Sequence, residues 1–290
     1  MSDIRIANPI RTAGILRRYE IGAKKKYGQN FLIDEGLLEE IVEASGISGD
    51  DLAVEIGPGI GGMTEILCER AGQVLAIEID ERLIPVLQDT VGHFDNLTIL
   101  HADVLKTDIA AWARENAYGR RIRVVANLPY YITTPILMSL LEGDAPIESI
   151  TVMVQREVAD RMISGPGTKD YGALSLAVQY YADPEIVAEV PRESFDPMPG
   201  VESAVVTLKK YETPPVEVES RELLFDIIRA SFSQRRKTLA NGLGNAQNIH
   251  LTKDEIKDVI RECGWDERIR GETLTLSEFA KLAQIIYTKI

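Results

Sequence analysis

From residue 52 to residue 209 the chain alternates short apolar runs with stretches of helical periodicity, and this alternation restricts the folds open to it. The apolar runs predict strands at 52–56, 74–78, 97–100, 122–126, 150–154, 184–190 and 203–209. The intervals predict helices near 61–70, 81–91, 107–116, 134–141, 156–163 and 172–182. Apolar strands that alternate with helices predict an α/β fold, with a seven-stranded, mostly parallel sheet covered on both faces. The last two strands are compatible with an antiparallel hairpin at its edge.

The segments on either side of this pattern are different in character. Helical periodicity is present at 13–19 and at 31–45. After Pro214-Pro215 the pattern is purely helical, with helices predicted at 221–232, 253–263 and 276–287. We therefore predict three parts: a basic N-terminal arm (1–30), an α/β domain (31–212) and a small helical domain (213–290).

The charge of the chain is unevenly distributed. The net charge is −13, which taken alone argues against a nucleic-acid partner. Residues 1–30, however, carry a net +5, and so does the stretch 227–253, which contains no acid. Because phosphate binding depends on fields within roughly 8–10 Å, two basic islands on an acidic body can direct a polyanion to one face. Each island taken alone is equally consistent with a solvated helix surface.

Several features favour an intracellular protein without a membrane span. No window approaches 18 uncharged apolar residues, and the N-terminus lacks the apolar core of a signal peptide. The two cysteines, Cys68 and Cys263, lie far apart and have no metal-type spacing. We expect a reduced, cytoplasmic protein with no metal site.

A glycine-rich loop, Glu55-Ile-Gly-Pro-Gly-Ile-Gly61, joins the first predicted strand to a helix. Gly57 and Gly59 let a ligand approach the backbone there without a Cβ in the way. The loop fits a dinucleotide or S-adenosylmethionine equally well. About twenty residues later, Glu78 ends the next strand, where a carboxylate accepts hydrogen bonds from ribose hydroxyls. Asp80 faces the same side by alternation, so periodicity does not separate the two acids.

The tetrapeptide Asn127-Leu128-Pro129-Tyr130 follows the fourth predicted strand. An amide, a rigid proline and an aromatic ring at a strand exit suit a planar base held by its exocyclic amine. With the glycine loop, this motif points to methyl transfer onto a base nitrogen. A nucleotide-dependent oxidoreductase is the weaker interpretation, because it leaves the tetrapeptide unexplained.

These segments resemble a known family when they are taken together. Gln29-Asn30-Phe31-Leu32, the loop 55–61, Glu78, Asp103, the tetrapeptide 127–130 and Phe195-Asp-Pro-Met-Pro199 occur in this order. The chain looks like a ribosomal RNA adenine dimethyltransferase over essentially its whole length. The resemblance implies a class I (Rossmann-like) methyltransferase domain with a small C-terminal all-α RNA-binding domain. It implies dimethylation of two adjacent adenines near the 3′ end of small-subunit rRNA, during assembly of the 30S subunit.

The resemblance also implies roles for individual residues. S-adenosylmethionine, which leaves as S-adenosylhomocysteine, would be bound by Asn30, Leu32, Gly57, Gly59, Glu78, Asp103 and Asn127. The target amine would be held by Asn127 and the carbonyl of Leu128, next to Pro129. Tyr130 and Phe195 would stack on the two faces of the flipped base. RNA contacts are expected from Lys24, Lys25, Lys26, Arg156, Arg235, Arg236 and Lys237.

Two other functions remain compatible with the residues. The first is a large-subunit rRNA adenine dimethylase of the antibiotic-resistance type. The N-terminal extension and the helical tail favour the small-subunit enzyme instead, by resemblance. The second is a ribosome-assembly factor that binds RNA and methylates it only secondarily. We expect a monomer that contacts rRNA within an assembling particle.

Overall fold

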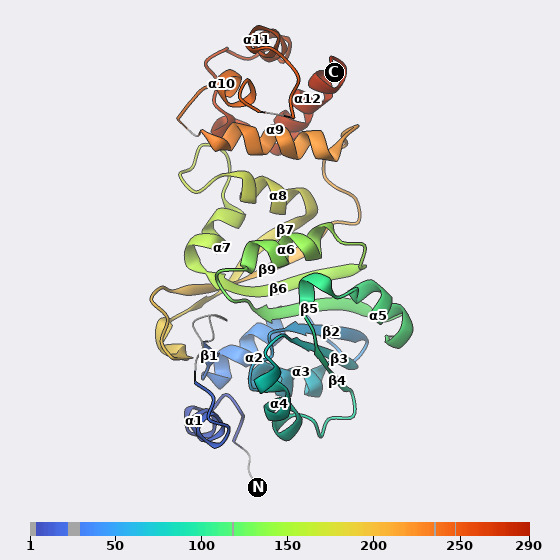
Figure 1. Ribbon diagram of the computed structural model, residues 1–290, viewed down its shortest axis with the longest axis vertical. Helices are drawn as coiled ribbons and strands as arrows, with labels where there is room; N and C mark the ends of the chain where they lie inside the picture. Colours follow the sequence, from blue (N-terminus) through green and yellow to red (C-terminus); the bar gives the residue numbers. More distant parts are fainter. Residues whose placement is uncertain (1–3, 23–29, 118, 235, 247) are drawn as a thin grey trace. The chain divides into compact units, whose positions relative to one another are not determined.

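The computed structural model describes residues 4–22, 30–117, 119–234, 236–246 and 248–290 (Figure 1). The chain forms two compact units, each made of two segments. Unit 1 comprises Met1–Ala159 and Pro184–Lys210, and unit 2 comprises Asp160–Asp183 and Tyr211–Ile290. This division differs from the predicted domains, because it places the segment 160–183 with the helical tail.

A seven-stranded sheet runs in the order β4-β3-β2-β5-β6-β9-β7 (Figure 1). The first five strands in that order pair in parallel, and β9 pairs antiparallel to β6. The mostly parallel α/β fold is therefore confirmed. The strands are β2 (Asp51–Ile56), β3 (Gln73–Glu78), β4 (Leu97–His101), β5 (Arg121–Asn127), β6 (Ile147–Gln155), β7 (Ala182–Val190) and β9 (Ser203–Lys210).

The predicted helices of the alternating region are also present. They are α3 (Gly62–Arg70), α4 (Ile84–Thr90), α5 (Ile109–Asn116), α6 (Thr133–Glu142), α7 (Arg156–Ile163) and α8 (Ala173–Tyr181), with 3-10 turns η2 (Glu81–Leu83), η3 (Val104–Lys106) and η4 (Arg192–Ser194). Leu67 and Val74 are fully buried where α3 packs on the sheet. Burial of each such side chain contributes about 1.5–3 kcal/mol.

The helix predicted from Phe31 begins four residues later than expected. Its N-cap is Asp34, whose side chain accepts a hydrogen bond from the Leu37 amide, and α2 spans Glu35–Ala44. Phe31–Leu32 instead form a short strand, β1, antiparallel to β8 (Phe195–Asp196). The prediction was wrong here because two apolar residues do not reveal a partner strand about 160 positions away.

The N-terminal segment is part of unit 1. Asn8 caps α1 (Pro9–Arg18), and proline occupies the first helical position, where its missing amide costs nothing. Ile6 is fully buried, and its amide donates to Glu65 at 2.9 Å. Residues 4–22 are therefore packed against the α/β core, although their composition suggested a basic arm.

Unit 2 consists of helices around an aromatic core. Figure 1 shows α10, α11 and α12 gathered on one side of α9. The Tyr180 ring of α8 packs edge-on against Phe225 of α9, with ring centroids 5.2 Å apart. Capping boxes at Thr252 and Thr275 start two of the helices. The tail elements are α9 (Arg221–Ser233), α10 (Leu239–Leu243), α11 (Lys253–Glu262), η5 (Gly271–Thr273) and α12 (Leu276–Tyr287).

No helix in the described ranges is both long enough and apolar enough to cross a bilayer.

Candidate active site

A pocket lies at the carboxyl edge of the sheet in unit 1. Strands β2, β3, β4 and β5 are parallel, so the residues that follow them reach the same edge. The side chains predicted for cofactor and target meet in this pocket, with the exception of Phe195. Those that line it are Asn30, Leu32, Gly57, Gly59, Glu78, Asp103, Asn127, Leu128, Pro129 and Tyr130.

The glycine loop after β2 adopts a backbone that only glycine takes readily. Gly57, Gly59 and Gly61 have φ angles of 70°, 63° and 95°. A Cβ at Gly61 would also lie 3.0 Å from Val91. The loop therefore exposes bare backbone to the pocket and leads directly into α3.

Glu78 supplies an anchored carboxylate at the end of β3. It is 4% exposed and accepts hydrogen bonds from the amides of Asp80, at 2.7 Å, and Gly59, at 3.4 Å. Burial raises the pKa of Glu78, and the backbone donors oppose that shift. A carboxylate held in this way presents acceptors to a ligand with hydroxyl groups.

The structure separates Glu78 from Asp80. The Asp80 carboxylate accepts from Arg82 Nε at 3.0 Å and Nη2 at 2.6 Å, and Asp80 is not among the pocket-lining residues. Asp103, after β4, does line the pocket, and its Oδ1 accepts from the Leu105 amide at 3.0 Å. Glu78 and Asp103 are thus the two acids that the strand ends bring to the pocket wall.

Asn127 ends β5, and its side-chain amide is oriented by Asn30, the residue before β1. Its Nδ2 donates to the backbone carbonyl of Asn30 at 3.3 Å, which leaves Oδ1 as an acceptor. The next amide, of Leu128, donates to Met153 of β6 at 3.3 Å. Among the described residues, none donates to the Leu128 carbonyl. Two oxygen acceptors, one from a side chain and one from the backbone, therefore follow each other at this strand end.

Pro129 and Tyr130 complete the strand exit. The Pro129 carbonyl accepts from the Ile132 amide and the Thr133 hydroxyl, both at 3.1 Å, and so fixes the turn into α6. The half-buried Tyr130 has its hydroxyl 2.7 Å from the Ser203 hydroxyl of β9. Tyr131 also lines the pocket and is 61% exposed, so it is a rim residue rather than part of the core.

Phe195 occupies a different environment from the one predicted. It is 4% exposed, lies in β8 opposite Leu32, and packs in the hydrophobic core of unit 1. It is not among the pocket-lining residues. In this conformation both faces of its ring are covered by protein, so the arrangement offers no support for stacking on a base.

Sequence reasoning did not single out Glu55, which lines the pocket floor. It is 1% exposed within β2 and accepts a hydrogen bond from the Thr64 hydroxyl at 2.6 Å. Burial raises the pKa of Glu55 to about 8. The sequence does contain one sign of Glu55's special position: it is an acid inside an otherwise apolar run, Val54-Glu55-Ile56. Ile6 and Ala7 of the N-terminal segment were likewise missed as lining residues.

The predicted RNA-binding residues fall into three groups. Lys24, Lys25, Lys26 and Arg235 lie outside the described residues. Arg156 forms an ion pair with Glu189 at 2.5 Å. Arg236 and Lys237 are both exposed, after the end of α9.

The basic residues described in the N-terminal segment are largely paired with acids. Arg5 pairs with Glu39 and Glu69, Arg11 with Glu65, and Arg18 with Asp89. This local neutralisation weakens the first basic island as an attractor for phosphate.

The sequence matches one protein family over most of its length. Residues 21–280 match the family model described as "Ribosomal RNA adenine dimethylase". The chain is 58% identical over 286 residues to "Ribosomal RNA small subunit methyltransferase A" of Lachnoclostridium phytofermentans, covering 98% of this chain and 99% of the relative. It is 53% identical to the protein of the same name from Geobacillus thermodenitrificans, covering 97% of each.

Solved structures show the same architecture. A dimethyladenosine transferase from Plasmodium falciparum superposes with a TM-score of 0.72 at 26% identity, covering 87% of this chain and 95% of that one. The 23S rRNA methyltransferase ErmE superposes with a TM-score of 0.67 at 25% identity, covering 89% of this chain and 100% of the other. Both similarities extend beyond the sheet into the rest of the chain.

Proposed function

The chain belongs to the ribosomal RNA adenine dimethylase family, and we propose that it transfers methyl groups from S-adenosylmethionine to two adjacent adenines near the 3′ end of small-subunit rRNA. The products are dimethyladenosines. The observation that carries the proposal is the strand exit at Asn127, where Asn127 and Leu128, each with an oxygen acceptor, line a pocket that the glycine loop and Glu78 also line.

The choice of small-subunit rRNA rests on the relatives. Eight curated proteins at 46–58% identity, each covered almost completely, carry the name of a small-subunit methyltransferase. ErmE, named for 23S rRNA, is far more distant at 25% identity. These comparisons favour the small subunit over the large-subunit alternative.

The pocket residues fit S-adenosylmethionine. Glu78 offers acceptors suited to ribose hydroxyls, and Asp103 offers one suited to an adenine amine. The bare backbone at Gly57 and Gly59 admits the amino-acid portion. When bound, the cofactor supplies an electrophilic methyl group on a sulfonium.

The chain's own contribution is to hold and orient the target amine. The lone pair of an adenine amine is delocalised into the ring, which makes the amine a poor nucleophile. Asn127 Oδ1 and the Leu128 carbonyl accept hydrogen bonds from its two protons and favour a more tetrahedral nitrogen, aimed into the pocket. Positioning of this kind supplies most of the catalysis. Stacking on Tyr130, at about 1–3 kcal/mol per base, offsets part of the cost of taking the base out of its stack.

The proposed partner is the rRNA of an assembling 30S particle, bound by a monomer in the cytoplasm. The names of the relatives support an rRNA substrate. Arg236 and Lys237, just after the end of α9, are the described cations of the second basic island best placed to contact phosphates.

Incubation with labelled S-adenosylmethionine and undermethylated small subunits tests the proposal. Digestion of the RNA is expected to release labelled dimethyladenosine, with none formed on large-subunit RNA. Label confined to large-subunit RNA would support the alternative dimethylase. Tight binding to small subunits without transfer would instead identify an assembly factor.

A further inference from the structure

A hydrogen bond links Tyr130, which lines the pocket after β5, to Ser203 of β9. In the sheet, β9 lies two strands away from β5. Tyr130 lies just after β5, and Ser203 is the first residue of β9. In the sheet order β6 lies between them, so their 2.7 Å contact passes over the carboxyl end of β6. Neighbouring strands are about 4.8 Å apart, so a residue as long as tyrosine is needed to span that gap.

The environment of Ser203 indicates a specific purpose for its hydroxyl. Ser203 is 2% exposed, and the residues that follow it, Ala204 and Val205, are fully buried and apolar. A hydroxyl placed there must find a partner, and the partner is Tyr130. Thr207, also on β9, bonds instead to Thr151 of the adjacent β6, at 3.0 Å, away from the pocket lining.

We propose that Ser203 is a positioning residue that holds the Tyr130 ring in place for stacking on the target base. The proposal rests on the function proposed above and extends it to a residue outside the pocket lining. The turn at Pro129 holds the Cα end of Tyr130, and Ser203 holds the hydroxyl end. With both ends held, the direction of the ring axis is set before the base arrives, so less rotamer freedom is lost on binding.

A double-mutant cycle on small-subunit methylation tests this inference. Ser203→Ala and Tyr130→Phe each remove one side of the same hydrogen bond. We expect kcat to fall about three- to tenfold in either variant, the range of one neutral hydrogen bond, with KM for S-adenosylmethionine unchanged. The double variant should be no worse than the more impaired single variant, because the two changes remove one interaction.

Thr207→Val is the matched control, since it breaks a buried hydroxyl pair on the same strand. It should lower the melting temperature without lowering kcat. If the wild type methylates small subunits, undiminished kcat in Ser203→Ala or Tyr130→Phe overturns the inference and leaves the proposed function intact. Reductions in kcat that multiply in the double variant overturn it too. A wild type that methylates no adenine refutes the proposed function itself.

Discussion

The side-chain amide of Asn127 donates to the backbone carbonyl of Asn30 at 3.3 Å, a bond between residues 97 positions apart. This hydrogen bond engages Nδ2 of the Asn127 side chain and so leaves Oδ1 as the acceptor. Asn30, the residue before β1, thus takes part in orienting the group proposed to hold the target amine. Ile6 and Ala7, of the N-terminal segment, also line the pocket.

Replacement of Asn127 by alanine removes the Oδ1 acceptor. We expect kcat to fall by about 10²- to 10³-fold, as when one preorganised polar group is removed from an active site. Cofactor affinity, measured by calorimetry, should stay within a few-fold. Asn116→Ala is the control, because Asn116 also donates from Nδ2 to a backbone carbonyl but lies on α5, outside the pocket lining. Full activity of the Asn127 variant would refute its role.

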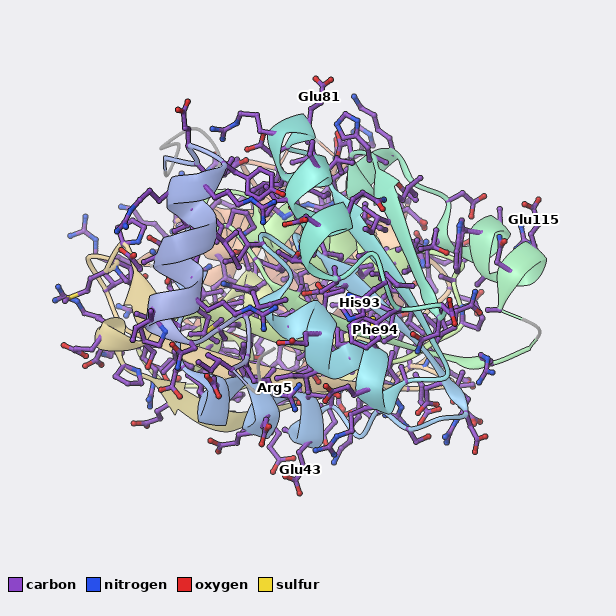
Figure 2. All side chains as sticks on the ribbon, turned by 90° about the horizontal axis from the view of Figure 1, so that it is seen from below. Arg5, Glu43, Glu81, His93, Phe94 and Glu115 are labelled. Atoms are coloured by element: carbon purple, nitrogen blue, oxygen red, sulfur yellow. The ribbon has the colours of Figure 1, made fainter. Side chains whose placement is uncertain are left out.

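Glu78→Gln tests the cofactor contact. The change replaces a charged acceptor by a neutral group of similar volume. A hydrogen bond to a charged group contributes about 1.5–3 kcal/mol. We therefore expect the Kd for S-adenosylmethionine to rise about 10- to 100-fold. Glu81→Gln is the matched control, because Glu81 is exposed and projects outward (Figure 2). Equal affinity of the two variants would rule Glu78 out as a ligand-binding residue.

The raised pKa of Glu55 makes a prediction about stability and pH. Its pKa of about 8 in the fold lies above its usual 4.5, so between these values the native state holds a proton that the unfolded state has released. The free energy of unfolding should therefore fall as pH rises from about 5 to 8, by at most about 1.4 kcal/mol per pH unit for this group.

Urea unfolding of Glu55→Gln across that range checks the Glu55 contribution. The variant should show a flatter dependence on pH. Burial shifts the pKa of Glu78 in the same direction, so some slope should remain. Parallel curves for wild type and variant would contradict the assignment.

Arg236 and Lys237 are expected to contact RNA phosphates. Replacing both by glutamine should weaken RNA binding and reduce the slope of log K against log salt by about 1 for each phosphate that is no longer neutralised. Lys257→Gln with Arg261→Gln is the matched control, because these cations already pair with Asp254 and Asp258 on α11. An unchanged slope would assign Arg236 and Lys237 to a solvated surface.

Most of the residues predicted from the sequence for the site line one pocket, because they lie at strand ends. Glu78, Asp103 and Asn127 each follow or end an apolar run, and parallel pairing brings such positions to one edge without any knowledge of side-chain packing. Sequence periodicity did not distinguish Glu78 from Asp80. The difference arises from Arg82, which binds Asp80 through a local turn.

The features that the sequence did not predict depend on distant contacts. Phe195 is covered because β8 pairs with β1, an interaction of two residues on each side that leaves no periodic signal. Ile6 is buried in a segment that carries a net positive charge. The charges of that segment suggested RNA binding, whereas Arg5 and Arg18 pair in the fold with acids of α2, α3 and α4.

The two-segment construction of unit 2 has a consequence for synthesis of the chain. The Tyr180 and Tyr181 rings of α8 leave the ribosome about 45 residues before Phe225 of α9 does. At roughly 5–20 residues per second, that delay is about 2–9 s. During this interval α8 lacks the aromatic partner that covers it in the native fold, and the nascent chain displays an apolar surface of the kind that chaperones bind.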